Sequence, residues 1–376
     1  MTSIHGECSP KFAAVKAAFE KNFAEKDDIG ASVAITHEGE FVADLWGGQL
    51  SREDKTPWEK DTIINVWSST KTMAALCMLM LADRGELDLD APVSRYWPEY
   101  AANGKEGTLV RHFMSHTAGL SGMDETVAEG ALYDWDWMTK ALAAQSPWWE
   151  PGTKPGYHAL TQGYLLGEVL RRVTGQSMGA FFKQEIADPL DADFHIGVPD
   201  AAMARICPLT APAERDVGDS DSIADRTFRN PAIKVAFTES DGWKRSEIPA
   251  ANGHGNARSI VRAQTAMANG GSAFDKQIIS EAMTKRVFEE QMRGTDMVLG
   301  VPMTYGMGYG INSDLTPLGP NKHICYWGGY GGSVVFIDQD ARLCLSYVMN
   351  RMEPGLVGDT RGMDLIMAAY MSLMAG

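Results

Sequence analysis

The sequence predicts an α+β fold in which an antiparallel sheet is flanked by terminal helices and a mostly helical domain is inserted between the strands. Two observations support this prediction. Strand-like alternation is found near both ends of the chain, at residues 30–46 and 326–349, whereas helical spacing of apolar residues prevails between about residues 68 and 250. A single sheet built from both ends, with the helices inserted between them, accounts for both observations.

The N-terminal elements alternate between helix and strand. Apolar residues at helical spacing predict a helix over residues 10–23. Residues 30–35 and 41–46 are predicted as two strands, joined by a turn that contains Gly39. Residues 62–67 are predicted as a short strand or extended lead-in.

The central elements are predicted as helices. The first begins at Ser68, and Gly85 supplies a C-terminal stop because glycine readily adopts the left-handed conformation there. Residues 163–173 and 178–186 have helical patterns and are separated by a turn. Acidic and polar residues at 214–225 predict a solvated loop.

The C-terminal elements return to the sheet. A helix is predicted over residues 259–268, followed by a strand around Tyr326 and two more strands at residues 333–337 and 343–349. The last predicted element is a helix over residues 363–374.

These elements predict two structural units. Residues 1–67 and 255–376 are expected to form one discontinuous α/β domain, and residues 68–254 a mostly helical domain. The cleft between two such units is the natural position for an active site.

The composition indicates a soluble globular protein that binds neither nucleic acid nor membranes. The chain has 376 residues and a net charge of -15, and so acidic a surface repels phosphate backbones and anionic lipids. The N-terminus lacks a basic segment followed by an apolar core. The 5 cysteines are scattered, without a C-x-x-C pair, which favours reduced thiols over disulfides or a zinc site. We therefore expect a cytoplasmic protein without a metal or cofactor, and its oligomeric state stays open.

The sharpest chemical signal is the segment from Ser68 to Lys71, where a strand gives way to an apolar helix. The two residues are three apart, so one helical turn places them on the same face. A serine hydroxyl needs a neighbouring base to become a nucleophile, and a lysine can be that base if burial lowers its pKa. Residues 73–81 are apolar on every face, which predicts a buried helix. The alternative is that Ser68 caps the helix and Lys71 is a surface charge.

Tyr157 is a candidate partner for these two residues. It lies in a Pro- and Gly-rich loop just before a predicted helix, from which its hydroxyl can point into a cleft. A nearby lysine is expected to favour its phenolate form, which would make it a general base. The alternative is an ordinary half-buried loop tyrosine.

A Gly-rich segment follows Trp327, with four glycines among residues 328–332. Glycines allow the backbone to approach a ligand closely. The backbone N–H of Tyr330 is therefore a candidate oxyanion donor, together with the N–H of Ser68 at the helix N-terminus. The alternative is a hairpin whose glycines serve turn geometry alone.

Together these segments resemble the serine β-lactamase-related superfamily of the class C and penicillin-binding type, and most of all the family VIII carboxylesterases. The resemblance covers nearly the whole chain and includes stretches at residues 87–93, 108–120, 157–175 and 305–310. It implies that Ser68 is the acylated nucleophile and that Lys71 and Tyr157 form its base pair. It also implies a fold with a discontinuous α/β part and an all-helical part.

Two departures from the lactamase motifs favour an esterase. The Y-x-N motif of the lactamases is Tyr157-His158-Ala159 here, without the asparagine amide. Their K-T-G strand is W-G-G here, the form familiar among the carboxylesterases, without the lysine that would meet a substrate carboxylate. An apolar indole at that point disfavours an anionic β-lactam and suits a neutral ester. We therefore expect a serine carboxylesterase for small neutral esters, with only weak β-lactam hydrolysis.

Several residues beside the catalytic ones are expected to contact the substrate. Trp148 is a candidate for an apolar pocket wall, although packing within the helical domain explains it as well. His158 follows Tyr157 directly and is a second candidate. The expected substrate-binding residues are Trp327, Gly328, Gly329, His158 and Trp148.

Other interpretations of the motifs are weaker or stay open. Residues 175–179 fit G-x-S-x-G, but they follow a helical pattern and not the strand that an α/β-hydrolase elbow needs, so Ser177 is expected to cap a helix. His112 and His116 have the spacing of helical metal ligands, but no H-E-x-x-H motif is present. The Ser68 site also suits a β-lactamase, an amide hydrolase or an acyltransferase, and a penicillin-recognising binder that acylates without turnover is a further alternative.

Overall fold

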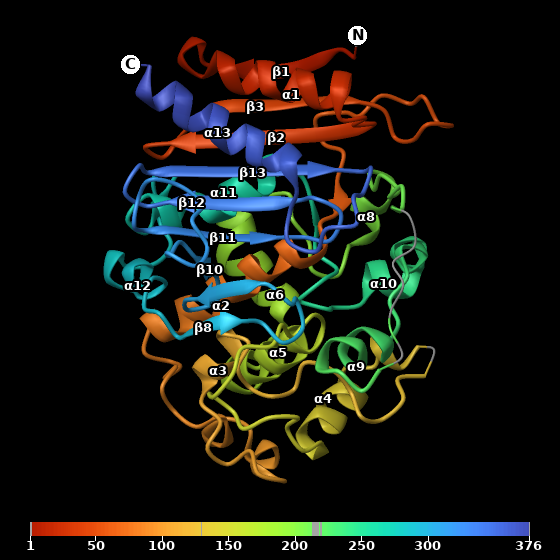
Figure 1. Ribbon diagram of the computed structural model, residues 1–376, viewed down its shortest axis with the longest axis vertical. Coiled ribbons are helices and arrows are strands. Elements are labelled where there is room, and N and C mark those ends of the chain that lie inside the picture. Colours follow the sequence, from red (N-terminus) through yellow and green to blue (C-terminus); the bar gives the residue numbers. More distant parts are fainter. Residues whose placement is uncertain (1, 129, 213–217, 219, 376) are drawn as a thin grey trace.

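Nine strands form one antiparallel sheet in the computed structural model, which describes residues 2–128, 130–212, 218 and 220–375 (Figure 1). The strand order is β1-β3-β2-β13-β12-β11-β10-β9-β8. The strands are β1 (Ile4–Cys8), β2 (Gly30–His37), β3 (Glu40–Gly48), β8 (Met292–Thr295), β9 (Pro302–Tyr305), β10 (Gly310–Ile311), β11 (Ile324–Gly328), β12 (Val334–Asp338) and β13 (Leu343–Met349). The sheet thus joins strands from both ends of the chain, and the predicted α+β class is confirmed.

The two ends of the chain meet in the middle of this sheet. β2 pairs with β13 in antiparallel register, from His37 opposite Leu343 to Ala31 opposite Met349. β2 is buried along nearly its whole length, as expected for a central strand that is covered on both faces.

Asn350, directly after β13, closes this junction with its fully buried side chain. Its Oδ1 accepts the backbone N–H of Gly30 at 2.9 Å. Its Nδ2 donates to the carbonyl oxygens of Gln49 and Leu50 at 2.9 and 2.8 Å. The amide thus supplies hydrogen-bond partners to buried backbone groups beside β2 and β3, of which Leu50 O is also reached by the Cys207 thiol at 3.3 Å.

Helices cover both faces of the sheet (Figure 1). α1 (Ala13–Glu25) and α13 (Thr360–Met374) pack against each other on one face, and α11 (Ala257–Ala268) packs against β2, β12 and β13 on the other. The predicted terminal helices are thereby confirmed.

The part of the chain drawn below the sheet in Figure 1 is mostly helical. α2 (Lys71–Asp83) lies at its centre, is buried along its length and packs against α5, α6 and α11. The other helices are α3 (Val110–Met114), α4 (Trp135–Ala144), α5 (Thr161–Thr174), α6 (Met178–Phe182), α7 (Asp188–Leu190), α8 (Asp200–Met203), α9 (Ile223–Arg229), α10 (Asp241–Arg245) and α12 (Glu281–Arg286). Short 3-10 turns are η1 (Pro10–Phe12), η2 (Trp67–Thr70), η3 (Val93–Arg95), η4 (Pro98–Ala101), η5 (Ala131–Tyr133) and η7 (Val235–Glu239), and a π-helical turn, η6 (Lys183–Ala187), follows α6.

Two short strands pair where the chain is expected to pass between the two predicted domains. β4 (Ile64–Asn65) and β5 (His254–Gly255) form a separate two-stranded sheet, as do β6 (Ser272–Ala273) and β7 (Lys276–Gln277). The β4–β5 pairing holds the two expected crossing points side by side. The division into residues 1–67 with 255–376 and residues 68–254 stays a prediction.

The structure differs from the predicted elements where the sequence pattern is weak. β1 has exposed residues in its middle and lacks the alternation of a half-buried strand, and β8 to β10 are too short to produce a pattern. The predicted strand at residues 62–67 contains only the two residues of β4. The α-helical part of the next element begins at Lys71, after the turn η2, and not at Ser68.

Capping side chains shift two further boundaries. The predicted loop at residues 214–225 ends earlier, because α9 begins at Ile223 and the side chain of Ser222 caps it; residues 214–217 and 219 lie outside the described residues. α13 begins three residues before its predicted start, where the side chain of Asp359 accepts the N–H of Arg361.

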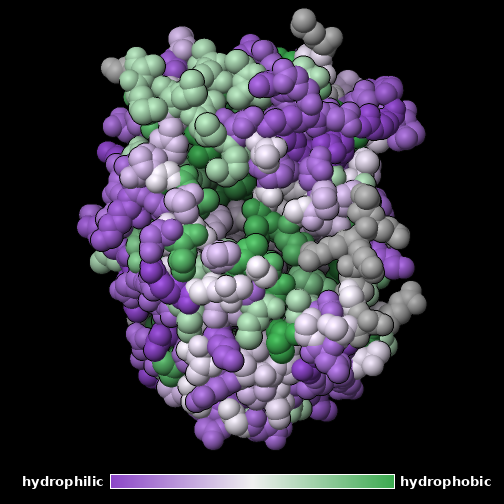
Figure 2. All heavy atoms as spheres, in the orientation of Figure 1, coloured by the Kyte–Doolittle hydropathy of each residue, from purple (hydrophilic) through white to green (hydrophobic). Residues whose placement is uncertain are grey.

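Figure 2 shows apolar residues gathered over α13 on the face seen in Figure 1. The face of α13 that packs on the protein carries Leu365, Ile366 and Ala369. Methionines spaced at helical intervals lie on the opposite face, and Met367 and Met371 are 60% and 57% exposed. Within the described ranges, no helix is both long and apolar enough to cross a membrane.

We expect Asn350→Ala to lower the free energy of unfolding by about 2–4 kcal/mol, because the buried backbone groups that its amide satisfies lose their partner. Urea denaturation followed by circular dichroism measures the change. Gln184→Ala is the control, since the amide of Gln184 is exposed and contacts only the side chains of Gln176 and Glu185; its effect should stay within about 0.5 kcal/mol. Equal losses in the two variants would contradict the role given to Asn350.

Candidate active site

Ser68 lies in the tight turn η2, between β4 and α2. The residue before it, Trp67, has a φ of 49°. This value lies in the left-handed region, which costs a bulky residue about 1–3 kcal/mol to adopt. The indole of Trp67 packs against the rings of Trp243 and Tyr330, with centroids 5.4 and 5.6 Å away. This packing holds the strained backbone and fixes the position from which Ser68 projects. Ser68 keeps 8% of its surface exposed.

Lys71 is buried in the first turn of α2, close to Ser68. Its Nζ donates to the carbonyl oxygens of Ala159 at 2.7 Å and Ala250 at 2.9 Å, and it lies 3.2 Å from Ser68 Oγ. Burial lowers the pKa of Lys71 well below its ordinary value of 10.5, because the protein interior disfavours the ammonium form. The alternative of a surface lysine is therefore wrong.

Tyr157 completes a cluster with these two residues. Its hydroxyl is hydrogen-bonded to Ser68 Oγ, and Lys71 Nζ lies 4.7 Å from the centroid of its ring. Asp296, which is fully buried, holds the loop: one oxygen accepts the N–H of Tyr157 at 3.0 Å and the other accepts the hydroxyl of Tyr305 at 2.7 Å. The structure thus brings together the three residues that the sequence singled out as catalytic.

The pKa of Tyr157 differs from the expectation that lysine favours its phenolate. Burial raises this pKa above its ordinary value of 10.0, and the charge of Asp296 acts in the same direction. The hydrogen bond with Ser68 opposes the rise without overcoming it. The phenolate expectation is wrong for the resting site, since a buried lysine with a lowered pKa supplies little positive charge.

His158 lies beside Tyr157 but uses both ring nitrogens within the protein. Its Nδ1 contacts Gly156 O at 2.6 Å, and its Nε2 accepts the N–H of Leu120 at 3.0 Å. Burial lowers the pKa of His158 to about 3, so the ring is neutral and Nδ1 is the donor. The ring braces two loops, and the predicted contact of His158 with a substrate gains no support from this geometry.

His116 is a residue of the site that the sequence patterns did not assign to it. Its Nδ1 accepts the N–H of His158 at 3.1 Å. Its ring lies edge-on to Tyr157 and stacks on Trp327, with centroids 5.0 and 5.3 Å away. Burial lowers the pKa of His116 well below 6.5. The one signal for this position is its place in the Ser115-to-Leu120 stretch. The four-residue spacing from His112 resembles that of metal ligands, but without an H-E-x-x-H motif it did not predict a metal site.

The Gly-rich segment after β11 approaches Ser68 from the other side. A Cβ on Gly329 would lie 2.3 Å from Val66 O and 3.4 Å from Ser68 N, so only glycine allows this approach. Ser333 Oγ donates to Val66 O at 2.9 Å and ties the end of the segment to the same turn. The ring of Tyr330 packs on Trp67, as described above. The two backbones expected to supply oxyanion donors are thus neighbours.

The predicted substrate-binding residues at the end of β11 are buried. Trp327 is 1% exposed and packs on Tyr157, with ring centroids 5.6 Å apart. Among the described residues, no hydrogen-bond partner lies within reach of its indole N–H. Gly328 is covered by the chain at Val357, where a Cβ would lie 2.2 Å from the carbonyl carbon.

Trp148 and Ser177 make their hydrogen bonds with residues other than Ser68, Lys71 and Tyr157. Trp148 donates from Nε1 to Asp124 at 2.8 Å, and the guanidinium of Arg226 lies 3.9 Å above its ring. Ser177 caps α6, as predicted, and its Oγ donates to Glu247 at 2.6 Å. α5, a helix, precedes Ser177, so the strand that a nucleophile elbow requires is absent at this point.

Comparison with known proteins identifies the family of this chain. A Beta-lactamase family model matches residues 17–367. The crystal structure of a family VIII carboxylesterase superposes with a TM-score of 0.93 at 39% identity, covering 98% of this chain and 100% of that one. A penicillin-binding protein homologue from Caulobacter crescentus gives a TM-score of 0.92 at 37% identity, with the same coverage of 98% and 100%. The esterase/β-lactamase LipL of Mycobacterium tuberculosis is 34% identical over 371 residues, 94% of this chain and 84% of that protein. The chain therefore belongs to the β-lactamase family.

Proposed function

We propose that this protein is a serine carboxylesterase that hydrolyses small neutral esters with short acyl chains through an acyl-enzyme on Ser68. The observation that carries the proposal is that Ser68 Oγ lies within hydrogen-bond reach of both Lys71 Nζ and the Tyr157 hydroxyl. The names of two relatives point in the same direction, since one is a family VIII carboxylesterase and the other an esterase/β-lactamase.

Lys71 is the base in this proposal, and Tyr157 relays the proton. A neutral amine has two N–H groups, which match the carbonyls of Ala159 and Ala250. The lone pair of the Lys71 nitrogen can then accept the proton of the Ser68 hydroxyl. The raised pKa of Tyr157 keeps its hydroxyl protonated, so it can donate a proton and take one back from its neighbours.

The reaction then proceeds by acyl transfer in two steps. Ser68 Oγ attacks the ester carbonyl as its proton moves to Lys71, and the backbone N–H groups of Ser68 and Tyr330 stabilise the oxyanion. The proton returns through Tyr157 to the leaving alcohol as the C–O bond breaks. A water molecule then gives a proton to the same pair and attacks the acyl-enzyme. The bond between the acyl carbon and Ser68 Oγ breaks, the proton returns to Oγ, and the acid leaves.

The substrate class follows from the charge at the end of β11. Trp327 stands where the lactamases carry a lysine and provides no charge for a substrate carboxylate, which favours neutral esters. β-Lactam hydrolysis is the second candidate function, because the name of LipL includes that activity alongside esterase.

We expect Ser68→Ala to abolish both ester hydrolysis and covalent labelling by a serine-directed phosphonate, because the nucleophilic oxygen is lost. Peptide mass mapping of the labelled wild-type protein should place the phosphonate on Ser68. Ser177→Ala serves as the control and should keep its activity within about twofold, since the Ser177 hydroxyl caps α6 and donates to Glu247, and contacts none of Ser68, Lys71 and Tyr157. Label on the peptide that contains Ser177 would overturn the assignment.

We expect kcat/KM of the wild-type enzyme to rise with pH through a midpoint well below 10.5. The reason is that burial lowers the pKa of Lys71, and only the neutral amine accepts a proton. Lys71→Met should lower kcat/KM by ~10²–10⁴-fold and remove this ascending limb. Tyr157→Phe should lower the rate but keep the limb. Hydrolysis of a nitrophenyl ester across the pH range measures both effects, and loss of the limb only in Tyr157→Phe would make Tyr157 the base.

We expect kcat/KM for a short-chain nitrophenyl ester to exceed that for a chromogenic cephalosporin by about 10-fold to 150-fold. This range corresponds to one missing charge-assisted hydrogen bond to the cephalosporin carboxylate, worth about 1.5–3 kcal/mol. Both substrates are assayed side by side with the same enzyme preparation. Comparable values for the two substrates would favour the β-lactamase alternative.

A further inference from the structure

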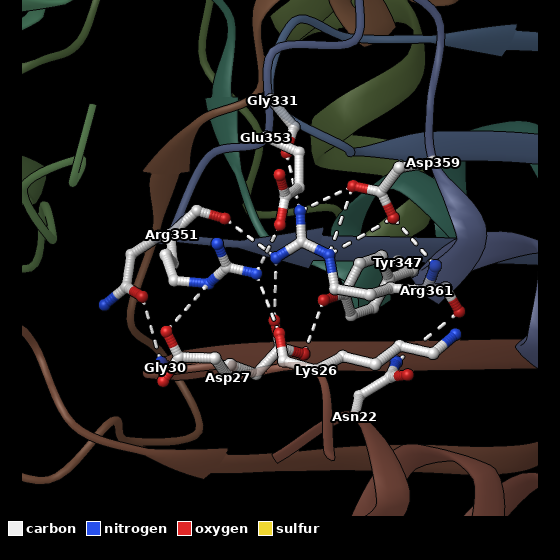
Figure 3. A network of polar contacts seen from close by, with 12 residues as sticks. Asn22, Lys26, Asp27, Gly30, Gly331, Tyr347, Arg351, Glu353, Asp359 and Arg361 are labelled. Atoms are coloured by element: carbon white, nitrogen blue, oxygen red, sulfur yellow. Dashed lines mark hydrogen bonds and ion pairs between the residues drawn. The ribbon is translucent and has the colours of Figure 1, made fainter. Parts of the chain in front are cut away.

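A buried arginine, Arg361 in the first turn of α13, lies beneath the segment that carries Tyr330 (Figure 3). Its side chain is 1% exposed. Nη1 donates to Asp28 Oδ1 and Arg351 O, both at 2.8 Å. Nη2 donates to Gly331 O at 2.7 Å and to Asp359 Oδ2 at 2.5 Å, and Nε donates to Asp359 at 3.1 Å. All five guanidinium N–H groups therefore have an acceptor within reach.

The guanidinium of Arg361 is paired with two carboxylates inside the protein, those of Asp28 and Asp359. The side chain of Asp28 has no exposed surface, and its second oxygen accepts the hydroxyl of Tyr347 at 2.5 Å. Asp359 is 14% exposed and also caps α13. A buried ion of either sign is costly unless it is paired and fully hydrogen-bonded. Because the two carboxylates hold the guanidinium in place, its hydrogen bond to Gly331 O fixes the position of that carbonyl group on the Gly-rich segment.

Gly331 and Gly332 pack directly against the side chains of Asp359 and Arg361. The two glycines have φ values of 97° and 127°, which disfavour any other residue. A Cβ on Gly332 would lie 2.2 Å from Asp359 Oδ2 and 2.5 Å from Arg361 Nη2. Gly331 O also accepts the N–H of Glu353 at 2.9 Å. The backbone is therefore clamped from below at the residue that follows Tyr330.

We propose that Arg361 is a positioning residue for the oxyanion site: by holding Gly331 O, two peptide groups beyond the Tyr330 N–H, it fixes the course of the segment so that this N–H faces Ser68. The inference rests on the proposed function, in which that N–H stabilises the oxyanion. The Tyr330 ring packs on Trp67, and the guanidinium holds the backbone at Gly331. Both contacts together orient one N–H group.

Lysine cannot replace arginine in this position. An ammonium has three donors at one point, whereas the planar guanidinium spreads five donors over acceptors on three sides. Arg361→Lys therefore keeps a positive charge beside Asp28 and Asp359 but cannot also reach Gly331 O. The variant separates the charge of Arg361 from its contact with the segment.

We expect Arg361→Lys to lower kcat for a nitrophenyl ester by about 10-fold to 100-fold, because a small displacement of a catalytic group has an effect of this size. The rate constant of phosphonate labelling on Ser68 should fall in parallel, since the phosphonate oxygen occupies the oxyanion position. KM should change less than about threefold. A kcat within about twofold of wild type, or equal changes in kcat and KM, would overturn the inference.

Arg258→Lys is the matched control for the loss of a bidentate arginine–carboxylate pair. Arg258 binds both oxygens of Asp44, at 2.5 and 2.9 Å, between α11 and β3. Its substitution should destabilise the protein without a selective loss of kcat. Thermal unfolding of each variant is measured beside the kinetics. If the control loses as much kcat as Arg361→Lys, the effect is one of general stability and the inference fails.

A second variant covers the case in which Arg361→Lys does not fold. Asp359→Asn keeps the Arg361–Asp28 pair and can still cap α13, but it weakens the hold on Nη2 and Nε. We expect kcat and the labelling rate to fall about threefold to tenfold, and unchanged values would overturn the inference. Wild-type enzyme that neither hydrolyses the ester nor takes the label on Ser68 would instead refute the proposed function.

Discussion

The burial of one amine, that of Lys71, is the constraint on which the rest of the site depends. α2 is apolar on every side, so it packs in the centre of the molecule and takes the lysine of its first turn with it. Burial lowers the pKa of this amine, and two backbone carbonyl oxygens accept hydrogen bonds from it. A lysine at the protein surface would be charged and could not act as the base that we propose.

The remaining parts of the site are held in place by buried polar groups on other elements. Asp296 fixes the backbone of Tyr157, and Ser333 ties the Gly-rich segment to the turn before Ser68. Arg361 holds the same segment at Gly331 O. These anchors come from parts of the chain far apart in sequence. The site therefore forms only when both ends of the chain have entered the common sheet.

The sequence indicated the residues of the candidate site more reliably than their chemical state. Ser68, Lys71 and Tyr157 stand out because of local spacing, an apolar helix and a Pro- and Gly-rich loop, and the structure brings them together. The prediction that Tyr157 is ionised was wrong, because the pKa of its hydroxyl depends on how completely folding removes water from around it. His116 was missed for a related reason: its role arises from rings that pack around it, and no local pattern encodes them.

By itself, the sequence determined the α+β class, the central strands and the serine–lysine turn, because each arises from periodicity or spacing within a few residues. It also determined that Ser177 follows a helix and caps another. The tertiary structure alone decided that β1 and β8 to β10 extend the sheet and that His158 is a brace. It also decided that Arg361 reaches Gly331. These features rest on contacts between distant segments, and desolvation on folding sets their energies.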